Sequence, residues 1–277
     1  MPTEPGGWGL EGRVAVVTGG GAGIGGATAE LFARHGAQVE IAEIDPQRAA
    51  ERERVIRSAG GEVRARLVDL TDAGAVERWS AALLEERGAV DVLVNNVGHY
   101  LRARPFRSSD PDHWDALYRV NLHHVLLVTR ALLPGMLERR RGSIVNVHSV
   151  EAMRGYPGDP VYGAFKAAVA HFTTCLAVEL GRKGIRVNGV GPDLTQTPQV
   201  DYEAAVAPEQ RGMWESWAPL GRVGTPDEQA RVILFLASDQ SSFVTGHNIP
   251  VDGGSLAGGG WFWSPSARRF TNRPRDP

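Results

Sequence analysis

The sequence predicts a doubly wound α/β domain, in which a parallel sheet of about seven strands carries helices on both faces. Two observations lead to this prediction. Strand-like apolar runs alternate with helix-like stretches along most of the 277 residues, and a glycine-rich turn separates the first run from the first helix. The strand-like runs occupy residues 13–18, 38–43, 62–68, 91–95, 143–149, 185–190 and 248–251.

Length and composition favour one domain. A chain with 42% hydrophobic residues at this length can bury a single core, so we expect a catalytic domain over residues 1–254 and a C-terminal extension over 255–277. The 30 Lys and Arg residues against 32 Asp and Glu leave no basic field for nucleic acid. No secretory signal and no uninterrupted apolar run of about 18 residues is seen, so a cytoplasmic protein without a membrane span is expected.

Cysteine and histidine usage adds two expectations. The single Cys175 cannot form an internal disulfide, and its place in the apolar stretch from Phe165 to Leu180 predicts packing in a core or a subunit interface. The eight histidines show no spacing typical of metal ligands, so no metal is expected.

The first strand-like run, Arg13 to Thr18, leads into eight residues of which six are glycine, and then into the helix-like stretch Ala27 to His35. Glycines allow a tight turn and let a pyrophosphate approach main-chain N–H groups, while the helix start supplies partial positive charge. This context predicts a Rossmann-type dinucleotide-binding turn. Its expected cofactor contacts are Gly19, Gly21, Gly23, Ile24 and Gly25.

The second strand-like run ends on a carboxylate, Glu43. A carboxylate at this position accepts hydrogen bonds from both hydroxyls of an adenosine ribose and repels a 2′-phosphate, which favours NAD over NADP. Ala22 and Ile44 are uncharged and offer no cation to such a phosphate, and Ile44 is expected to pack on the adenine. The alternative is that Asp45, two positions on, binds the ribose instead.

Tyr162 and Lys166 are four residues apart, on one face of a helix if the segment is helical. A tyrosine with its ordinary pKa of about 10 is a poor acid–base catalyst at neutral pH, but a nearby positive charge lowers that pKa. Ser149 follows the apolar run Ile144 to Val147, so its hydroxyl can orient a substrate oxygen at a strand end. Each residue taken alone also has an ordinary structural explanation, as a solvated side chain or a turn residue.

The motifs Thr18-Gly19-x-x-x-Gly23-x-Gly25 and Asn95-Asn96-Val97-Gly98, followed by Asn121, Ser149, Tyr162 and Lys166, resemble the short-chain dehydrogenase/reductase family in its single-domain branch. The resemblance extends from about Leu10 to Gly254. The four positions from Tyr162 to Lys166 distinguish the chain from the enoyl-reductase-like branch, which has seven.

The resemblance implies a catalytic assignment. Tyr162 would exchange a proton with the substrate oxygen, and Lys166 would hold the nicotinamide ribose and depress the pKa of Tyr162. Asn121 would help to hold a water that relays protons towards Lys166. The resemblance also implies a homo-oligomer, a tetramer or a dimer, formed through the helices containing Trp114 to Leu133 and Tyr162 to Leu180.

Further cofactor contacts follow from the same resemblance. Asp69 is expected near the adenine, although it could equally cap the helix that follows Thr71. The remaining expected contacts are Leu70, Asn95, Gly98, Pro192 and Thr197.

One position departs from the family pattern. Asp193 stands where the family has a glycine after Pro192. Either the backbone there avoids positive φ, or the aspartate uses its tolerance for the left-handed region.

The substrate pocket is expected at the least regular parts of the chain, including the loop 194–218. Its candidate residues are His99, Glu151, Tyr156, Asp193, Leu194, Trp214 and Trp217. Their mixture of aromatic, apolar and a few charged groups suits a bulky, cyclic or partly apolar secondary alcohol or its ketone, oxidised or reduced with NAD(H). A cis-diol or polyol dehydrogenase is the alternative, and it demands more polar pocket groups.

A protein of another class, a non-catalytic dinucleotide-binding sensor, is also considered. The intact set of Ser149, Tyr162 and Lys166 argues against it, because a sensor does not need these residues together.

Past Gly254 the chain adds a glycine-rich link and the triplet Trp261-Phe262-Trp263. Three adjacent aromatic residues are costly to expose to water, so we expect this triplet to dock, for example on a neighbouring subunit.

Overall fold

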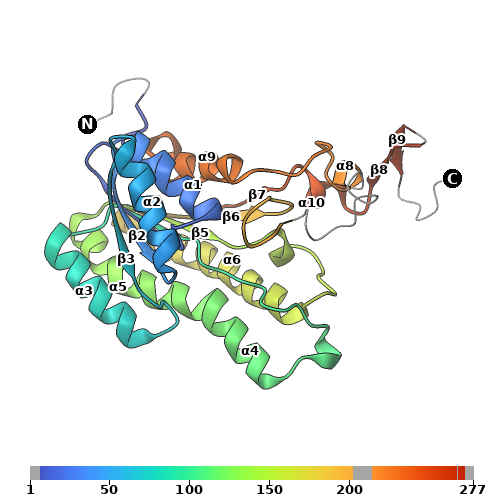
Figure 1. Cartoon of the computed structure of the whole chain (residues 1–277), viewed down its shortest axis with the longest axis horizontal. Coiled ribbons are helices and arrows are strands. Elements are labelled where there is room, and N and C mark those ends of the chain that lie inside the picture. The colour runs from blue at the N-terminus through green and yellow to red at the C-terminus, as the bar shows by residue number, and fades with distance from the viewer. Residues whose placement is uncertain (1–6, 202–213, 267, 272–277) are drawn as a thin grey trace.

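A computed structural model of the chain describes residues 7–201, 214–266 and 268–271, and it contains a seven-stranded parallel sheet (Figure 1). The strand order is β3-β2-β1-β4-β5-β6-β7. The strands are β1 (Val14–Thr18), β2 (Gln38–Glu43), β3 (Glu62–Leu67), β4 (Val92–Asn95), β5 (Gly142–Val147), β6 (Ile185–Pro192) and β7 (Asn248–Val251). Every predicted strand is present, with ends within two residues of the prediction, so the doubly wound α/β fold is confirmed.

Helices cover both faces of this sheet (Figure 1). One face carries α1 (Gly23–Arg34), α2 (Pro46–Ser58) and α9 (Pro226–Ala237), and the other carries α3 (Ala73–Arg87), α5 (His124–Arg139) and α6 (Pro160–Leu180). α4 (Pro111–Tyr118) leads into α5 through a π-helical turn, Arg119–His123. The sequence predicted one regular helix there, whereas the structure widens it around Asn121.

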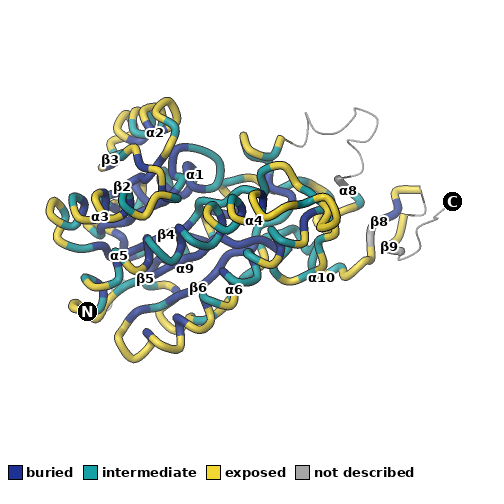
Figure 2. The backbone as a smooth tube through the Cα atoms, turned by 90° about the horizontal axis from the view of Figure 1, so that it is seen from below, coloured by how far each residue is buried: buried dark blue, intermediate teal, exposed yellow. Residues whose placement is uncertain are grey.

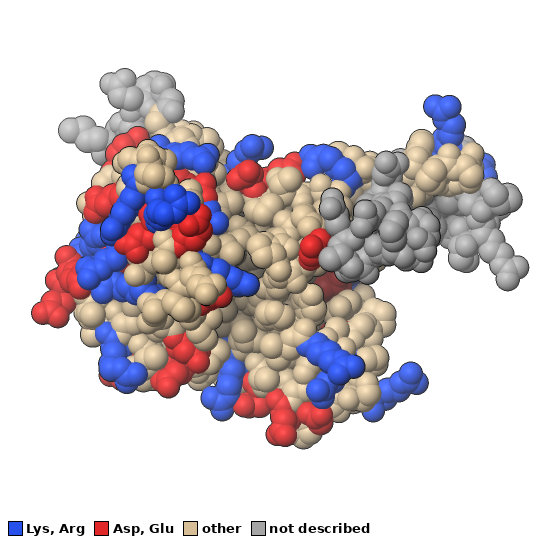
Figure 3. Space-filling model, viewed as in Figure 1, with Lys and Arg blue, Asp and Glu red and all other residues tan. Residues whose placement is uncertain are grey.

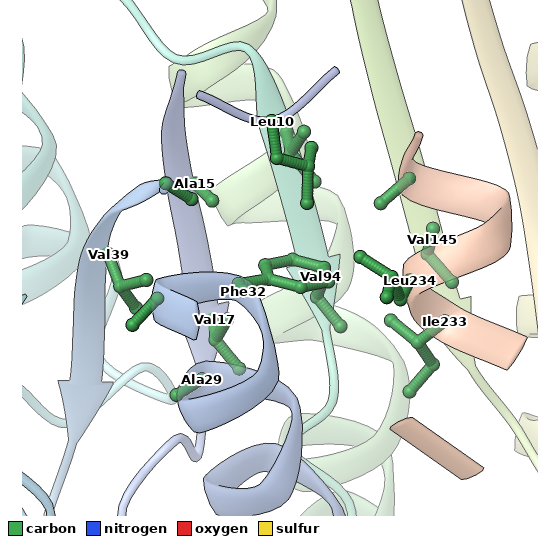
Figure 4. Packing of buried hydrophobic residues seen from close by; sticks show 14 of the residues in the cluster. Leu10, Ala15, Val17, Ala29, Phe32, Val39, Val94, Val145, Ile233 and Leu234 are labelled. Carbon is green, nitrogen blue, oxygen red and sulfur yellow. The ribbon is translucent and has the colours of Figure 1, made fainter. Parts of the chain in front are cut away.

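Two apolar cores result, one on each face of the sheet. Alternate residues of β1 supply them, since Ala15 and Val17 pack in the core of α1 and α9, and Val14 and Val16 pack in the other. Figure 4 shows Phe32 of α1 between the strands and α9. The central strands are buried along their length (Figure 2), as expected for a parallel sheet covered twice.

The strand order places the functional crevice. β1 lies between β2 and β4, and the chain continues outwards from these two strands in opposite directions. Loops that leave the carboxyl ends of β1 and β4 therefore diverge, and ligands of open α/β sheets bind in the crevice between such loops. The glycine-rich turn after β1 and the loop after β4 meet there.

The C-terminal extension forms structure of its own. α10 (Ser255–Gly258) leads to an antiparallel hairpin of β8 (Phe262–Ser264) and β9 (Arg269–Thr271), which stands away from the sheet and lies beside α8 (Trp214–Trp217) (Figures 1 and 2). Trp261 remains 52% exposed, so it does not dock on the sheet domain of its own chain. Docking on another subunit stays a prediction.

Three features of the surface bear on partners. The helical stretches Pro111–Arg139 and Pro160–Lys183 are long and apolar enough to cross a membrane, but core helices of soluble proteins pass the same test, and both pack on the sheet here. On the face shown in Figure 3, basic and acidic side chains are interspersed, without a field of one sign. Cys175 is exposed on the outer side of α6, so the expectation of core packing was wrong, and an interface position stays a prediction.

Candidate active site

The glycine-rich turn after β1 is held by hydrogen bonds that its main-chain N–H groups donate. The Gly19 N–H donates to the Ala42 carbonyl at 2.7 Å, and the Gly21 N–H donates to Glu43 Oε2 at 3.0 Å. A Cβ on Gly25 would overlap the Gly19 carbonyl, so only glycine lets α1 approach β1 this closely. Gly23 has φ of +54° and lies opposite Thr197.

A cavity of about 550 Å³ begins at this turn and continues along the carboxyl ends of the strands. That size suits a cofactor or substrate site. The predicted residues that line it are Gly19, Gly23, Ile24, Glu43, Ile44, Gly98, His99, Ser149, Glu151, Tyr156, Tyr162, Lys166, Pro192, Asp193, Leu194 and Thr197. Gly21 and Gly25 shape the turn without lining the cavity.

Other predicted residues are placed elsewhere. Trp217 lies in α8 outside the cavity lining, and the Trp214 side chain lies outside the described part of the chain. Within that described part, no group of three or more His, Cys, Asp and Glu side chains is arranged to hold a metal ion.

Asn95 was predicted to contact the cofactor, but the structure places its side chain outside the cavity lining. It is buried, and its Nδ2 donates to Asn146 Oδ1 at 2.8 Å and to Thr129 Oγ1 at 3.1 Å. Asn96, one residue on, lines the cavity and donates to the carbonyl of Thr18 at 3.0 Å. Successive side chains of a strand point to opposite faces, which accounts for the exchange.

Asp69 and Leu70 are likewise absent from the cavity lining. Asp69 Oδ1 accepts from the main-chain N–H of Thr71 at 2.9 Å and from its hydroxyl at 2.7 Å, while Leu70 is buried in the core of α3. The alternative helix-capping role of Asp69 is wrong, because Asp72 caps α3 through the Ala75 N–H. Contact of Asp69 and Leu70 with the adenine end of the cofactor stays a prediction.

Glu43 is the carboxylate that reaches the cavity, as predicted, and it is nearly buried. Besides the bond from Gly21, its Oε1 accepts from the N–H groups of Ile44 at 2.9 Å and Asp45 at 3.2 Å. Asp45 instead caps α2, since its Oδ1 accepts from the N–H of Gln47 and Arg48. The ribose-binding alternative for Asp45 is therefore not supported by its position.

Arg48 was missed by the sequence analysis. It lies in the first turn of α2 and lines the cavity beside Glu43, while its guanidinium pairs with Asp45 at 3.5 Å. The available signal was the Asp45-Pro46 helix start, because side chains in a first turn lean back towards the preceding loop. The Glu43 carboxylate and the Arg48 guanidinium therefore both reach this end of the cavity, which is called the adenosine end below. The sequence indicated only the carboxylate.

Ser149, Tyr162 and Lys166 come together at the other end of the cavity. Ser149 caps a short 3-10 turn, Val150–Ala152, where its Oγ accepts from the Glu151 N–H at 3.2 Å. Lys166 Nζ lies 5.7 Å from the centre of the Tyr162 ring and donates to the Val147 carbonyl at 3.4 Å. Gly98 borders this ammonium, and any Cβ there would overlap Nζ.

Burial dominates the proton affinities of both groups. It raises the pKa of the Tyr162 phenol, with an opposing contribution from the Ser149 hydroxyl and a further rise from the Glu151 charge. It also lowers the pKa of Lys166 to about 8. The predicted depression of the Tyr162 pKa by Lys166 is therefore not found, because desolvation of the phenol outweighs the effect of a distant ammonium.

Asn121 sits in the π-helical turn with its side chain fully used. Its Oδ1 accepts from the His99 N–H at 3.1 Å, and its Nδ2 donates to the carbonyls of His99 at 2.8 Å and Leu117 at 3.0 Å. The side chain thereby fixes the loop after β4, and it does not line the cavity. A direct role of this amide in holding a relay water is not supported by these contacts.

An ion-paired cluster closes the substrate end. Arg154 donates to Glu151 Oε1 at 2.8 Å and to Asp193 Oδ2 at 3.0 Å, and Ser255 Oγ donates to the same Asp193 oxygen at 2.6 Å. Of the two outcomes predicted for Asp193, its backbone avoids positive φ. The following residue, Leu194, takes φ of 33° instead.

Known proteins share these features. A family model described as enoyl-(acyl carrier protein) reductase matches residues 19–255. The 3-oxoacyl-(acyl-carrier-protein) reductase FabG of Thermotoga maritima is 41% identical over 245 residues, which cover 88% of this chain and 98% of that protein. The 2-keto-3-deoxy-L-fuconate dehydrogenase of Xanthomonas campestris is 35% identical, over 92% of this chain and 83% of the relative.

Among solved structures, a 7α-hydroxysteroid dehydrogenase complexed with NADH and 7-oxo glycochenodeoxycholic acid superposes with a TM-score of 0.83. It is 31% identical, and the match covers 89% of this chain and 95% of that one. The chain therefore belongs to the short-chain dehydrogenase/reductase family, and it is an oxidoreductase that binds a nicotinamide dinucleotide and acts on CH–OH groups of small molecules.

Proposed function

We propose that the protein interconverts a secondary alcohol and a ketone with NAD(H), using Ser149, Tyr162 and Lys166 as catalytic residues. One arrangement carries the proposal: the three side chains line a cavity that begins at a glycine-rich dinucleotide turn. The glycine-rich turn and these three side chains come from distant parts of the sequence, so their meeting at one cavity points to a shared site. When bound, the nicotinamide dinucleotide supplies or accepts the hydride.

Each of these side chains has a chemical task. The Ser149 Oγ accepts the Glu151 N–H, and its hydroxyl group lies close enough to Tyr162 to oppose the rise of that phenol's pKa. In the proposed reaction the Ser149 proton would be donated to the substrate oxygen and stabilise charge there. Tyr162 remains protonated at neutral pH because burial raises its pKa, which suits proton donation to a ketone oxygen. Lys166 lines the same cavity, where its ammonium would hold the nicotinamide ribose of the bound cofactor.

Glu43 supports the choice of NAD. Three main-chain N–H groups fix its carboxylate at the adenosine end of the cavity, and this charge opposes a 2′-phosphate. Arg48 on the same rim attracts such a phosphate, but its pairing with Asp45 offsets part of that charge. The residues Gly19, Gly23, Ile24, Ile44, Gly98, Pro192 and Thr197 complete the proposed cofactor surface.

The cavity suits a substrate larger than a simple alcohol. His99, Tyr156, Leu194, Glu151 and Asp193 surround its catalytic end, so aromatic, apolar and charged groups are all present. Enoyl reduction, the activity named in the description of the matching family model, is not proposed, because Tyr162 and Lys166 are only four positions apart. A non-catalytic sensor is also disfavoured, because all three catalytic side chains line the cavity.

Assembly and location are proposed more generally. The outer faces of α5 and α6 are apolar enough to form subunit contacts, so we infer a homo-oligomer, a tetramer or a dimer, in the cytoplasm.

A panel of secondary alcohols and ketones, followed by the absorbance of NADH, tests the reaction. Tyr162→Phe is expected to lower kcat by about 10³-fold and to leave NADH affinity unchanged, because only the proton carrier is lost. Tyr118→Phe is the matched control, since it removes a phenol outside the cavity lining. A Tyr162→Phe variant that keeps the full rate would refute the catalytic assignment.

A further inference from the structure

Two carboxylates line the catalytic end of the cavity, Glu151 and Asp193, and their side chains are only 14% and 12% exposed. A carboxylate with so little access to water requires hydrogen-bond donors. The described parts of the chain supply only some of them. The substrate is therefore expected to supply the remainder.

Glu151 is fixed relative to the proposed catalytic hydroxyl. It belongs to the same 3-10 turn as Ser149, and its main-chain N–H donates to Ser149 Oγ at 3.2 Å. Its charge is also close enough to raise the pKa of Tyr162. An atom held by Ser149 and Tyr162 therefore lies near this carboxylate, at a separation set by a short turn and not by a flexible loop.

The two carboxylates retain acceptor capacity. An ionised carboxylate has about four lone-pair sites. Among the residues that the structure describes, Glu151 receives two donors, both from Arg154, at 2.8 Å and 3.4 Å, which leaves about two sites. Asp193 receives three donors from the same described residues, namely Arg154, Ser255 and the Leu194 N–H, which leaves about one. Glu151 is thus the better partner for a ligand.

The charge of the cluster selects among ligands. Two carboxylates share one guanidinium, so the cluster carries a net charge of −1. Arg154 does not line the cavity, and it is directed at both carboxylates. A substrate carboxylate or phosphate would therefore meet like charge, whereas a neutral hydroxyl group would meet an acceptor.

We propose that the substrate is a neutral vicinal diol or polyol, whose reacting hydroxyl binds Ser149 and Tyr162 while its neighbouring hydroxyl donates to Glu151, assisted by Asp193. This proposal rests on the function proposed above and narrows its substrate class. It favours the polyol alternative over a bulky, largely apolar alcohol. Apolar carbon placed against Glu151 would leave a nearly buried charge short of donors.

The test compares two alcohols that differ by one hydroxyl group, cis-1,2-cyclohexanediol and cyclohexanol. Wild-type kcat/KM is expected to favour the diol by at least about tenfold, the effect of one hydrogen bond to a charged group. Glu151→Gln should lower this ratio by about tenfold, and Asp193→Asn should lower it by less. Glu51→Gln is the matched control, because Glu51 also pairs with an arginine three positions on, but in α2 and outside the cavity lining.

The outcomes separate the two proposals. A wild-type ratio near one, or a ratio unchanged in both Glu151→Gln and Asp193→Asn, overturns the diol proposal and leaves the alcohol dehydrogenase proposal intact. Faster turnover of a sugar acid than of the corresponding neutral polyol also overturns it. If no alcohol or ketone exchanges hydride with the cofactor, the proposed alcohol dehydrogenase function is refuted. The diol proposal is then tested by calorimetric binding of cis-1,2-cyclohexanediol and cyclohexanol to the NADH-saturated protein. Equal affinities for the two compounds refute the diol proposal.

Discussion

The two ends of the cavity are held by different kinds of hydrogen bond, mainly from main-chain groups at the Glu43 end and mainly between side chains at the Glu151 end. At the adenosine end, main-chain groups do most of the positioning: Glu43 is held by three N–H groups, and Asn96 binds the carbonyl of Thr18. At the substrate end, side chains hold one another. Arg154 joins Glu151 to Asp193, and Asp193 is joined in turn to Ser255 at the start of the extension.

The geometry of the adenosine end therefore follows from the fold, whereas the geometry of the substrate end depends on which side chains are present. A main-chain site needs only glycines at a few close contacts and a strand end of suitable length. A side-chain site needs several residues from distant loops at once, and one substitution changes its charge. The first should therefore be sensitive to added volume, and the second to altered charge.

The largest expected effect comes from added volume at the adenosine end. Gly25→Ala places a Cβ against the Gly19 carbonyl, so β1 and α1 must separate, and NADH affinity should fall by about 100-fold or more. Fluorescence titration measures the affinity, and circular dichroism checks the fold. Gly181→Ala is the control, because a Cβ there meets nothing within 4 Å. Affinity within threefold of wild type would contradict the main-chain account.

The second prediction concerns the junction of the two ends, where Lys166 is buried. Its pKa in the folded protein is about 8, below the ordinary value of 10.5, so burial of the charge costs stability at pH 7. Between those two pH values the unfolded chain holds a proton that the folded chain lacks, so the free energy of unfolding rises with pH. Lys166→Met should stabilise the apoprotein at pH 7 by on the order of 2 kcal/mol, flatten that rise and abolish turnover.

Denaturant unfolding at several pH values measures this effect. Lys183→Met is the control, because Lys183 is exposed at the end of α6 and should leave the pH dependence unchanged. A destabilised Lys166→Met variant would mean that the ammonium contributes more to the fold than its burial costs.

The contrast between the two ends also explains what the sequence could predict. Periodicity and the glycine spacing predicted the sheet, the turn and Glu43, because these depend on local structure near strand ends. The cavity residues Ser149, Tyr162 and Lys166 were predicted through the family resemblance, since each of them alone also had an ordinary structural explanation. The exchange of Asn95 for Asn96 needed the exact end of β4, which periodicity does not supply.

Other features could not be predicted because they depend on tertiary contacts. Arg154 pairs with a residue 39 positions away, and no local pattern indicates that pairing. The π-helical turn at Asn121 likewise accompanies contacts with the loop at His99, far along the chain. The raised pKa of Tyr162 depends on how much of its surroundings is desolvated, which a sequence motif does not reveal.

The third prediction sets the two charges of the adenosine end against each other. Wild type should bind NADH more tightly than NADPH, and Glu43→Gln should reduce that preference by about tenfold through loss of like-charge repulsion. Arg48→Gln should increase the preference a few-fold, because it removes the cation on the rim. Paired titrations measure both ratios, with the exposed Arg54→Gln of α2 as control. Tighter binding of NADPH by wild type would refute the role of Glu43.

The smallest expected effect tests the charges of the substrate end. The groups that raise the pKa of Tyr162, besides its burial, are Glu151, Tyr156 and Tyr100, and Arg154 partly neutralises Glu151. Alcohol oxidation requires the phenolate, so its rate rises with pH through the apparent pKa of this tyrosine. Arg154→Met exposes Tyr162 to the full Glu151 charge. The rising limb of the pH–rate profile should therefore move to higher pH by about half a unit.

Glu151→Gln provides the opposite arm of the same experiment, because it removes the negative charge and should move the limb to lower pH by a similar amount. Profiles of kcat/KM for one alcohol over a range of pH values measure both shifts. If each substitution only disturbs packing, the rate of each variant falls and the rising limb of its pH profile stays in place. If the limb moves in the same direction in both variants, a charge effect is excluded. Opposite displacements would show that the substrate end adjusts the proposed catalytic phenol through side-chain charge, in contrast to the main-chain construction of the adenosine end.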